Sequence, residues 1–201
     1  MIFSGFQNVI VKIRKQKVSI GLEFTDGNDK INIDVVPGRE LNQDQYAKDS
    51  KLNLYVFSQY GIYEQGNTSI RTNIQAQIDN IKSSGDRDSI RKNIRFLKGW
   101  KVNNQKVPKS FFFELITIKA FDNEDIEGDN WEQLKSVLEY IRDNVKTVTL
   151  TDPGNSANNV TDTLTVLEKS NLSDDMKFMI ERIEENSDNI KTYFKINEKH
   201  P

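Results

Sequence analysis

Apolar and polar residues alternate along the first part of the chain, which predicts β-strands that each have one apolar face. This period of two is present in residues 7–13 and 17–25, and the basic stretch 14–17 between them predicts a hairpin turn. Residues 26–29 are typical of a second turn, and alternation resumes in 30–36. The three segments therefore predict a small, antiparallel sheet.

The third predicted strand carries an acidic residue in its middle. Ile31, Ile33 and Val35 should turn inward, which places Asp34 on the opposite face. Strands are depleted in Asp, and burying an unpaired charge is costly. Two explanations are open: Asp34 lies on a solvated face of the sheet, or it has a partner such as a metal ion.

The period changes from two to that of a helix at about residue 68. Before this point lie a polar, loop-like segment (38–51) and one further predicted strand (52–57). After it, apolar residues recur every three or four positions. Helices are predicted at about 68–83, 89–100, 108–118 and 130–141 and near 160–171 and 174–195, with a short extended piece at 148–150 and a turn at 151–155.

This order of elements predicts an α+β fold, because the strands come first and the helices follow. We expect a sheet domain in residues 1–65 and an all-helical lobe in residues 66–201. The third helix, which Pro108 can begin, is apolar almost all round and should be central to the lobe.

Composition excludes several kinds of chemistry. The chain has 201 residues, a net charge of −2 and no cysteine, which excludes disulfides and cysteine nucleophiles and gives no sign of an obligate nucleic-acid binder. The one histidine, His200, gives no support to a histidine triad, and the glycines form no phosphate-binding loop.

No apolar run is long enough for a membrane span. We expect a soluble, cytoplasmic protein.

A second informative stretch joins the predicted helices at 89–100 and 108–118. Lys98 follows Leu97 and so lies off the buried stripe, while Ser110 lies where helix amides favour anions. Phe111 beside it could stack on a base. These residues predict a site for a nucleoside triphosphate. The alternative is an ordinary amphipathic helix pair with a solvated lysine and core phenylalanines.

Four short segments resemble, in this order, the later motifs of 2′,5′-oligoadenylate synthetases and of the bacterial cyclic-oligonucleotide synthases related to cyclic GMP–AMP synthase. They are residues 32–37 (NIDVVP), 95–100 (RFLKGW), 109–115 (KSFFFEL) and 152–160 (DPGNSANNV). The resemblance implies a nucleotidyltransferase palm sheet followed by a helical lobe. It also implies ATP binding, second-messenger synthesis and a part in antiviral defence.

The resemblance implies roles for individual residues. In this family, three acidic residues of the palm bind two Mg²⁺ ions, and Asp34 matches the third of them. Lys98 and Ser110 match residues that contact the donor phosphates, and Phe111 matches an aromatic residue that stacks on the base. The segment 152–160 is expected to shape the helical lobe, because Asp-Pro-Gly sequences form turns.

The first metal-binding motifs of the family are missing upstream of Asp34. Neither the Gly-Ser helix start nor the Asp-x-Asp pair occurs there. Asp86 and Asp88 have the right spacing, but they follow Asp34 and are placed to cap a helix. The chain is therefore expected to correspond to the C-terminal portion of a nucleotidyltransferase, with part of its palm, and to be inactive alone.

Two other interpretations remain open. The chain could be a non-catalytic nucleotide-binding or scaffold module, or one half of a split enzyme in which a second polypeptide supplies the missing carboxylates. It could also be an unrelated α+β interaction domain whose short motifs match by chance.

Overall fold

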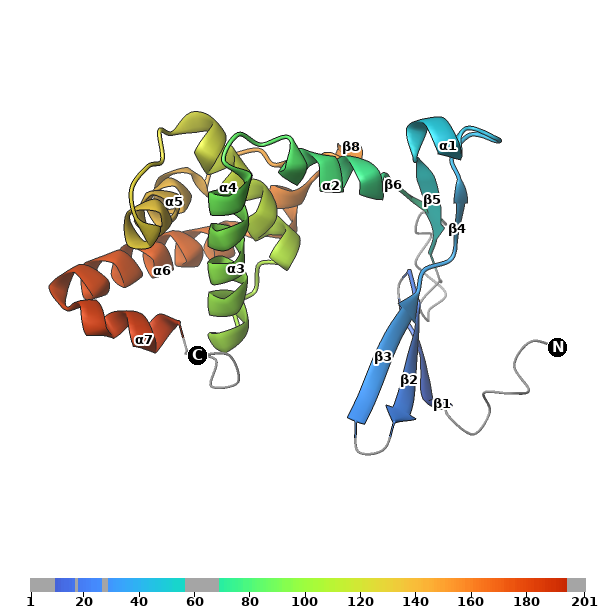
Figure 1. The fold of residues 1–201 in the computed structure, drawn as a ribbon, viewed down its shortest axis with the longest axis horizontal. Helices are drawn as coiled ribbons and strands as arrows, with labels where there is room; N and C mark the ends of the chain where they lie inside the picture. Colours follow the sequence, from blue (N-terminus) through green and yellow to red (C-terminus); the bar gives the residue numbers. More distant parts are fainter. Residues whose placement is uncertain (1–9, 17, 27–28, 57–68, 195–201) are drawn as a thin grey trace. The chain divides into compact units, whose positions relative to one another are not determined.

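The computed structural model describes residues 10–16, 18–26, 29–56 and 69–194 of the chain (Figure 1). The protein divides into two compact units, residues 1–76 and 77–201. The first unit is built mainly of strands and the second mainly of helices. This is the α+β order that the hydrophobic pattern predicts.

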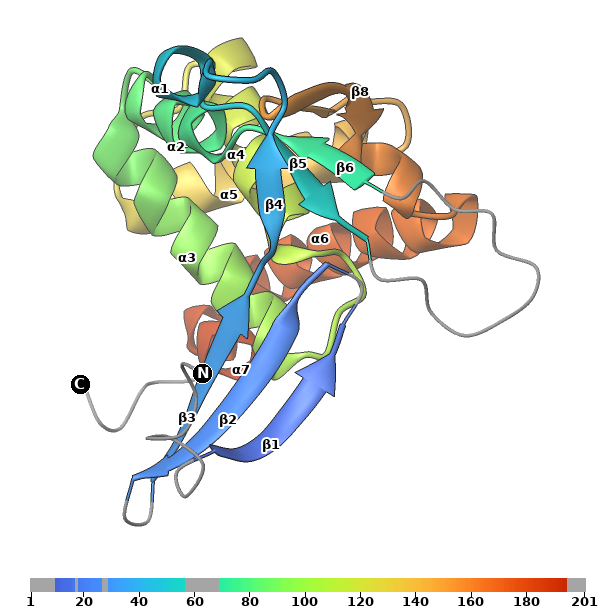
Figure 2. The ribbon, with the colours of Figure 1, turned by 90° about the vertical axis from the view of Figure 1, so that its right-hand side faces the viewer.

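The described residues of the first unit form two antiparallel, three-stranded sheets (Figure 2). One consists, in this order, of β1 (Ile10–Lys15), β2 (Ile20–Asp26) and β3 (Asp29–Val35). The other consists of β4 (Gly38–Glu40), β5 (Leu52–Tyr55) and β6 (Ser69–Thr72), with the short helix α1 (Tyr46–Asp49) between β4 and β5. The polar segment 38–51 is thus partly strand and helix, because Glu40 accepts hydrogen bonds from the amides of Gln45 and Tyr46 and so fixes the turn into α1.

The apolar face of the first sheet is not buried as the alternation predicted. Ile31, Ile33 and Val35 are 47–48% exposed, although they lie opposite residues of β2 with the same orientation. A three-stranded sheet buries a face only where another layer packs on it. The period of two therefore identified the strand and its faces correctly, but not the burial of one face.

The second unit is a bundle of helices with one small hairpin. The elements are α2 (Ile74–Lys82, which begins in the first unit), α3 (Arg87–Asn103), α4 (Ser110–Asn123), α5 (Asn130–Asn144), β7 (Thr151–Asp152), β8 (Asn155–Asn159), the 3₁₀ turns η1 (Val160–Thr163) and η2 (Ser187–Asn189), α6 (Val166–Glu185) and α7 (Ile190–Tyr193). None of the described helices is both long and apolar enough to cross a membrane.

Two helix predictions were wrong in their boundaries. Residues 69–72 form β6, so the first long helix begins at Ile74, because Ile70 pairs with Leu54 in the sheet. The two helices expected near 160–171 and 174–195 are mostly one helix, α6. It begins at a capping box formed by Thr165 and Glu168, and no helix-breaking residue interrupts it until Glu185.

The core of the second unit is centred on α4, as its uniformly apolar sequence predicted. Phe112, Phe113 and Ile116 are fully buried. The ring of Phe113 packs edge-on against Trp100 of α3, with centroids 6.0 Å apart, and against Phe112 at 5.4 Å. Such aromatic pairs are favourable beyond the area they bury, so these rings stabilise the packing of α3 against α4.

The segment that begins at Asp152 has a structural role. The Asp152 carboxylate is buried and accepts hydrogen bonds from Gln77 Nε2 (3.0 Å), the Gly154 amide (2.8 Å) and Asn158 Nδ2 (3.2 Å). These three hydrogen bonds offset the free-energy cost of removing the Asp152 carboxylate from water. The hairpin is thereby attached to α2.

Candidate functional site

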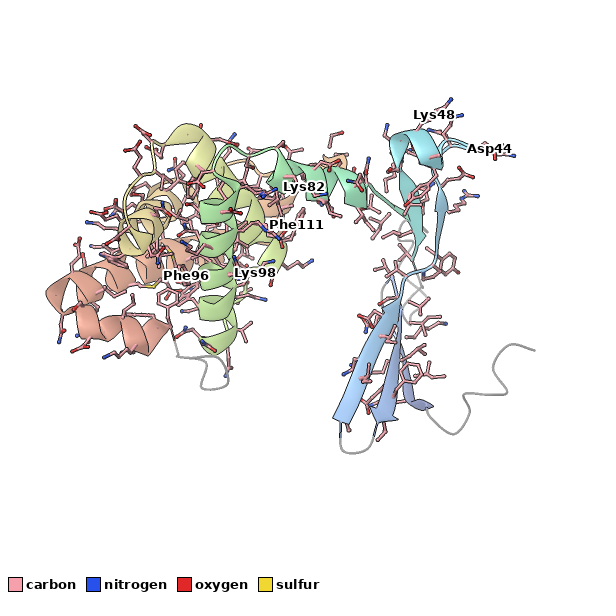
Figure 3. All side chains as sticks on the ribbon, viewed as in Figure 1. Asp44, Lys48, Lys82, Phe96, Lys98 and Phe111 are labelled. Carbon is pink, nitrogen blue, oxygen red and sulfur yellow. The ribbon has the colours of Figure 1, made fainter. Side chains whose placement is uncertain are left out.

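Three basic side chains line the outer side of α3. Arg91, Arg95 and Lys98 follow one another at intervals of four and three residues, so they lie on the same side of the helix. Together with Ile81 and Ile94 and with Glu114 of α4, they line a pocket of about 230 Å³. Figure 3 shows Lys98 and Phe96 leaving α3 on different sides, and Phe96 packs against Phe194. The basic pocket and the packed side of α3 are therefore separate.

Lys98 is paired with a carboxylate across the pocket. Its ammonium group forms an ion pair and hydrogen bond with Glu114, and the side chains are 36% and 22% exposed. The alternative interpretation expected a solvated lysine and core phenylalanines. Lys98 is partly exposed and ion-paired, and Phe112 and Phe113 are core residues. With Arg91 and Arg95, the pocket has three cations and one carboxylate and retains a positive excess that favours anions.

The sequence prediction of this site was incomplete. It identified Lys98 but missed Arg91, Arg95 and Glu114. The spacing of the two arginines relative to Lys98 was a usable signal, because residues at i, i+4 and i+7 share a helix side. Glu114 could not be found this way, since its place in the pocket depends on how α3 packs on α4.

Ser110 and Phe111 lie at the start of the helix that carries Glu114. Ser110 is the first residue of α4, and Lys109 before it makes no capping hydrogen bond with its side chain. The first amides of a helix favour anions, but neither Ser110 nor Phe111 is among the residues that line the pocket of Lys98. Phe111 is half-buried and packs against the core of the helical unit. Only part of its ring is therefore accessible to a ligand.

Asp34 lies in the first unit, in a defined polar setting on β3. It pairs with Gly21 of β2, and its Oδ1 accepts a hydrogen bond from Gln16 Nε2 at 3.2 Å. Ser19 Oγ in turn donates to Gln16 Oε1 at 3.1 Å. A Cβ atom at Gly21 would lie only 3.0 Å from Asp34 Oδ1, so the glycine leaves room for the carboxylate. Asp34 is exposed and oriented by its neighbours.

The carboxylate of Asp34 is a suitable oxygen ligand for Mg²⁺, but it does not make a two-metal site. In the described part of the chain, no three or more His, Asp or Glu side chains form a group that could hold a metal ion. Mg²⁺ is usually held by one or two carboxylates together with substrate phosphates and water. The described residues therefore do not fit the two-ion site that the resemblance implies.

A second polar pocket, of about 280 Å³, has the opposite character. Its lining includes Glu124, Glu139 and Asp143 as well as Tyr140 and Arg142. Burial, followed by the nearby Glu124 charge, raises the pKa of Tyr140, while a hydrogen bond from Arg142 lowers the pKa of Asp143. The guanidinium of Arg142 is already engaged by Asp143 at 2.7 Å. A phosphate group would be repelled here, so this pocket is not a candidate anion site, in contrast to the α3–α4 pocket.

An antiparallel sheet unit followed by a helical bundle is also the fold of solved cyclic-nucleotide synthases related to cyclic GMP–AMP synthase. One is the DncV cyclic AMP-GMP synthase of Vibrio cholerae in complex with nonhydrolyzable GTP. Its TM-score is 0.71, with 16% sequence identity over 91% of this chain and 52% of that chain. Another is CdnC of E. coli MS115-1 with ATP, with a TM-score of 0.63 and 20% identity over 86% of this chain and 58% of that chain.

The structural likeness confirms the resemblance to these nucleotidyltransferases and the α+β fold. The DncV structure with the linear intermediate 5′ pppA(3′,5′)pG gives a similar TM-score, 0.70. The chain spans about half the length of the DncV structures it matches. No protein-family model and no curated protein sequence matches the chain.

Proposed function

We propose that this chain is part of a nucleotidyltransferase of the second-messenger class and that its helical unit binds the phosphates of a nucleoside triphosphate. The observation that carries the proposal is the basic side of α3, where Arg91, Arg95 and Lys98 line one pocket. The similar structures solved with GTP or ATP support it. The proposed setting, by resemblance, is antiviral defence in the cytoplasm.

Each predicted residue has a place in this proposal. Lys98 and the two arginines would bind the donor phosphates, Ser110 and the start of α4 would bind a phosphate oxygen, and the accessible part of Phe111 would contact the base. The parent reaction transfers a nucleoside monophosphate from ATP or another nucleotide to a ribose hydroxyl and releases pyrophosphate. Cations held rigidly beside the leaving group stabilise the charge that develops on it.

Asp34 is proposed as one ligand of a Mg²⁺ site that this chain does not complete. Gln16 donates a hydrogen bond to its carboxylate and Gly21 leaves room for it, but a two-metal reaction needs further carboxylates. We divide the functions accordingly at the predicted boundary: residues 1–65 contribute part of the palm, and residues 66–201 contribute the phosphate pocket.

The first test locates the ligand. In a ¹⁵N-labelled sample, ATP should shift the amide signals of residues 91–98 and 110–114 most strongly, because the phosphates approach these segments. Adenosine, which lacks the phosphates, is the control and should leave 91–98 unchanged. Shifts confined to 124–144, around the acidic pocket, or no shifts at all would contradict the proposal.

The second test concerns catalysis. The purified chain, incubated with Mg²⁺ and labelled ATP, should release no pyrophosphate and form no oligonucleotide above the level of a protein-free blank, because one carboxylate does not hold two metal ions. Chromatography of the labelled products measures this. Robust product from the chain alone would show that the metal site has been misassigned.

A non-catalytic nucleotide-binding or scaffold module is the second candidate, including one half of a split enzyme. The half-exposed apolar face of β3 favours it, since such a face is suited to contact with a further polypeptide. ATP binding without product is expected under both proposals. Product that forms only when a second polypeptide is added would identify the split enzyme, whereas a scaffold would remain inactive.

A further inference from the structure

The buried carboxylate of Asp152 is connected to the α3–α4 pocket through α2. Gln77 of α2 donates a hydrogen bond to Asp152 Oδ1 at 3.0 Å, and Ile81, about one turn further along α2, lines the pocket beside its three cations. We propose that Gln77 and Asp152 are positioning residues of this pocket, because their hydrogen bond holds Ile81 in place as its apolar wall. This inference rests on the proposed function in one respect, that the pocket binds the phosphates of a nucleotide.

The apolar packing of α2 is slight. None of its nine residues, all of which are described, is buried, and Ile78 is exposed. Ile81 is partly buried and packs against the small cluster of Ile90, Ile94 and Ile118. Apolar contact is non-directional, so this packing alone leaves α2 free to turn on the cluster.

The hydrogen bond from Gln77 adds the missing direction. A hydrogen bond constrains both a distance and an angle, and one to a charged group is stronger than one between neutral groups. Gln77 and Ile81 are four residues apart, so they lie on the same side of α2, about 6 Å apart along its axis. A fixed Gln77 therefore also fixes where Ile81 lies.

Asp152 is suited to be the fixed acceptor of this bond. Its carboxylate is buried, and it also accepts hydrogen bonds from the Gly154 amide and from Asn158 Nδ2. Both of these donors belong to the β7–β8 hairpin. The hairpin thus orients the carboxylate independently of α2, and α2 attaches to it.

The position of Ile81 matters for the binding of an anion. The Ile81 side chain takes up space that water would otherwise fill beside the cations of α3. The attraction between opposite charges strengthens as the local dielectric constant falls. Displacement of Ile81 therefore weakens the attraction for a phosphate group without removing any cation.

Gln77→Ala tests the attachment, and Asn158→Ala is its matched control. The control removes a hydrogen bond from the same carboxylate but leaves the bond from Gln77 intact. Neither side chain is buried, so both variants should fold, which thermal unfolding verifies. Hydrogen exchange of the amides of residues 78–82 should be about tenfold faster in Gln77→Ala and unchanged in Asn158→Ala.

Calorimetry with ATP on the full chain tests the consequence for the pocket. The affinity should fall about fivefold in Gln77→Ala and also in Ile81→Ala, and it should not change in Asn158→Ala. Because Gln77 acts through Ile81, the double variant Gln77→Ala/Ile81→Ala should lose no more affinity than Ile81→Ala alone.

The outcomes separate this inference from the proposed function. Losses that multiply to about 25-fold in the double variant would overturn the inference, because Gln77 would then act independently of Ile81. Unchanged hydrogen exchange or unchanged ATP affinity in Gln77→Ala, or an equal loss of affinity in Asn158→Ala, would also overturn it. In these cases ATP still binds to the unmodified chain, so the proposed function stands. If the unmodified chain binds no ATP, both fail.

Discussion

Replacement of Phe113 by alanine should lower the free energy of unfolding of the helical unit by about 3–5 kcal/mol. Phe113 is fully buried and packs against both Trp100 and Phe112, so alanine loses these contacts and leaves a cavity. Urea denaturation followed by tryptophan fluorescence measures the effect. The signal reports this unit alone, because the two tryptophans of the chain, Trp100 and Trp131, both lie in it.

Phe178→Ala is the matched control for this substitution. Phe178 lies on α6 and is 60% exposed, so the same loss of a ring should change the free energy of unfolding by no more than about 0.5 kcal/mol. A small effect of Phe113→Ala, similar to that of the control, would contradict the assignment of α4 as the centre of the core.

The strands and most helices were predictable because their causes are local. Ile90, Ile94 and Leu97 of α3 are buried at helical spacing, and Asp86 caps this helix by accepting a hydrogen bond from the Ser89 amide. The predicted secondary structure was wrong where tertiary contacts determine which element forms. Ile70 continues the helical spacing of the residues after it but lies in β6, because β5 offers it hydrogen-bonding partners.

The candidate site was predictable only in part. Lys98 and the start of α4 could be identified from the sequence because the position of each is set within a single helix. Glu114 could not, because its contact with Lys98 requires the packing of two helices. The orientation of Asp34 depends likewise on the pairing of β2 with β3, which brings Gly21 beside it. The division of the chain at residue 65 and the roles of the site residues remain proposals.

We propose that the binding of ATP depends on Lys98. Lys98 is the residue shared by the resemblance, the basic side of α3 and the ion pair across the pocket. A hydrogen bond to a charged group contributes about 1.5–3 kcal/mol, so Lys98→Ala should weaken ATP binding by roughly 10- to 150-fold. Lys135→Ala, which removes the matched interhelical ion pair of α5 and α6, should leave the affinity unchanged.

Calorimetric titration of the unmodified chain and these two variants with ATP is the most direct test. We predict one ATP bound per chain, loss of most of the affinity in Lys98→Ala, and normal binding in Lys135→Ala. Absence of binding to the unmodified chain, or equal affinity in all three proteins, would contradict the assignment of a nucleotide site to the α3–α4 pocket.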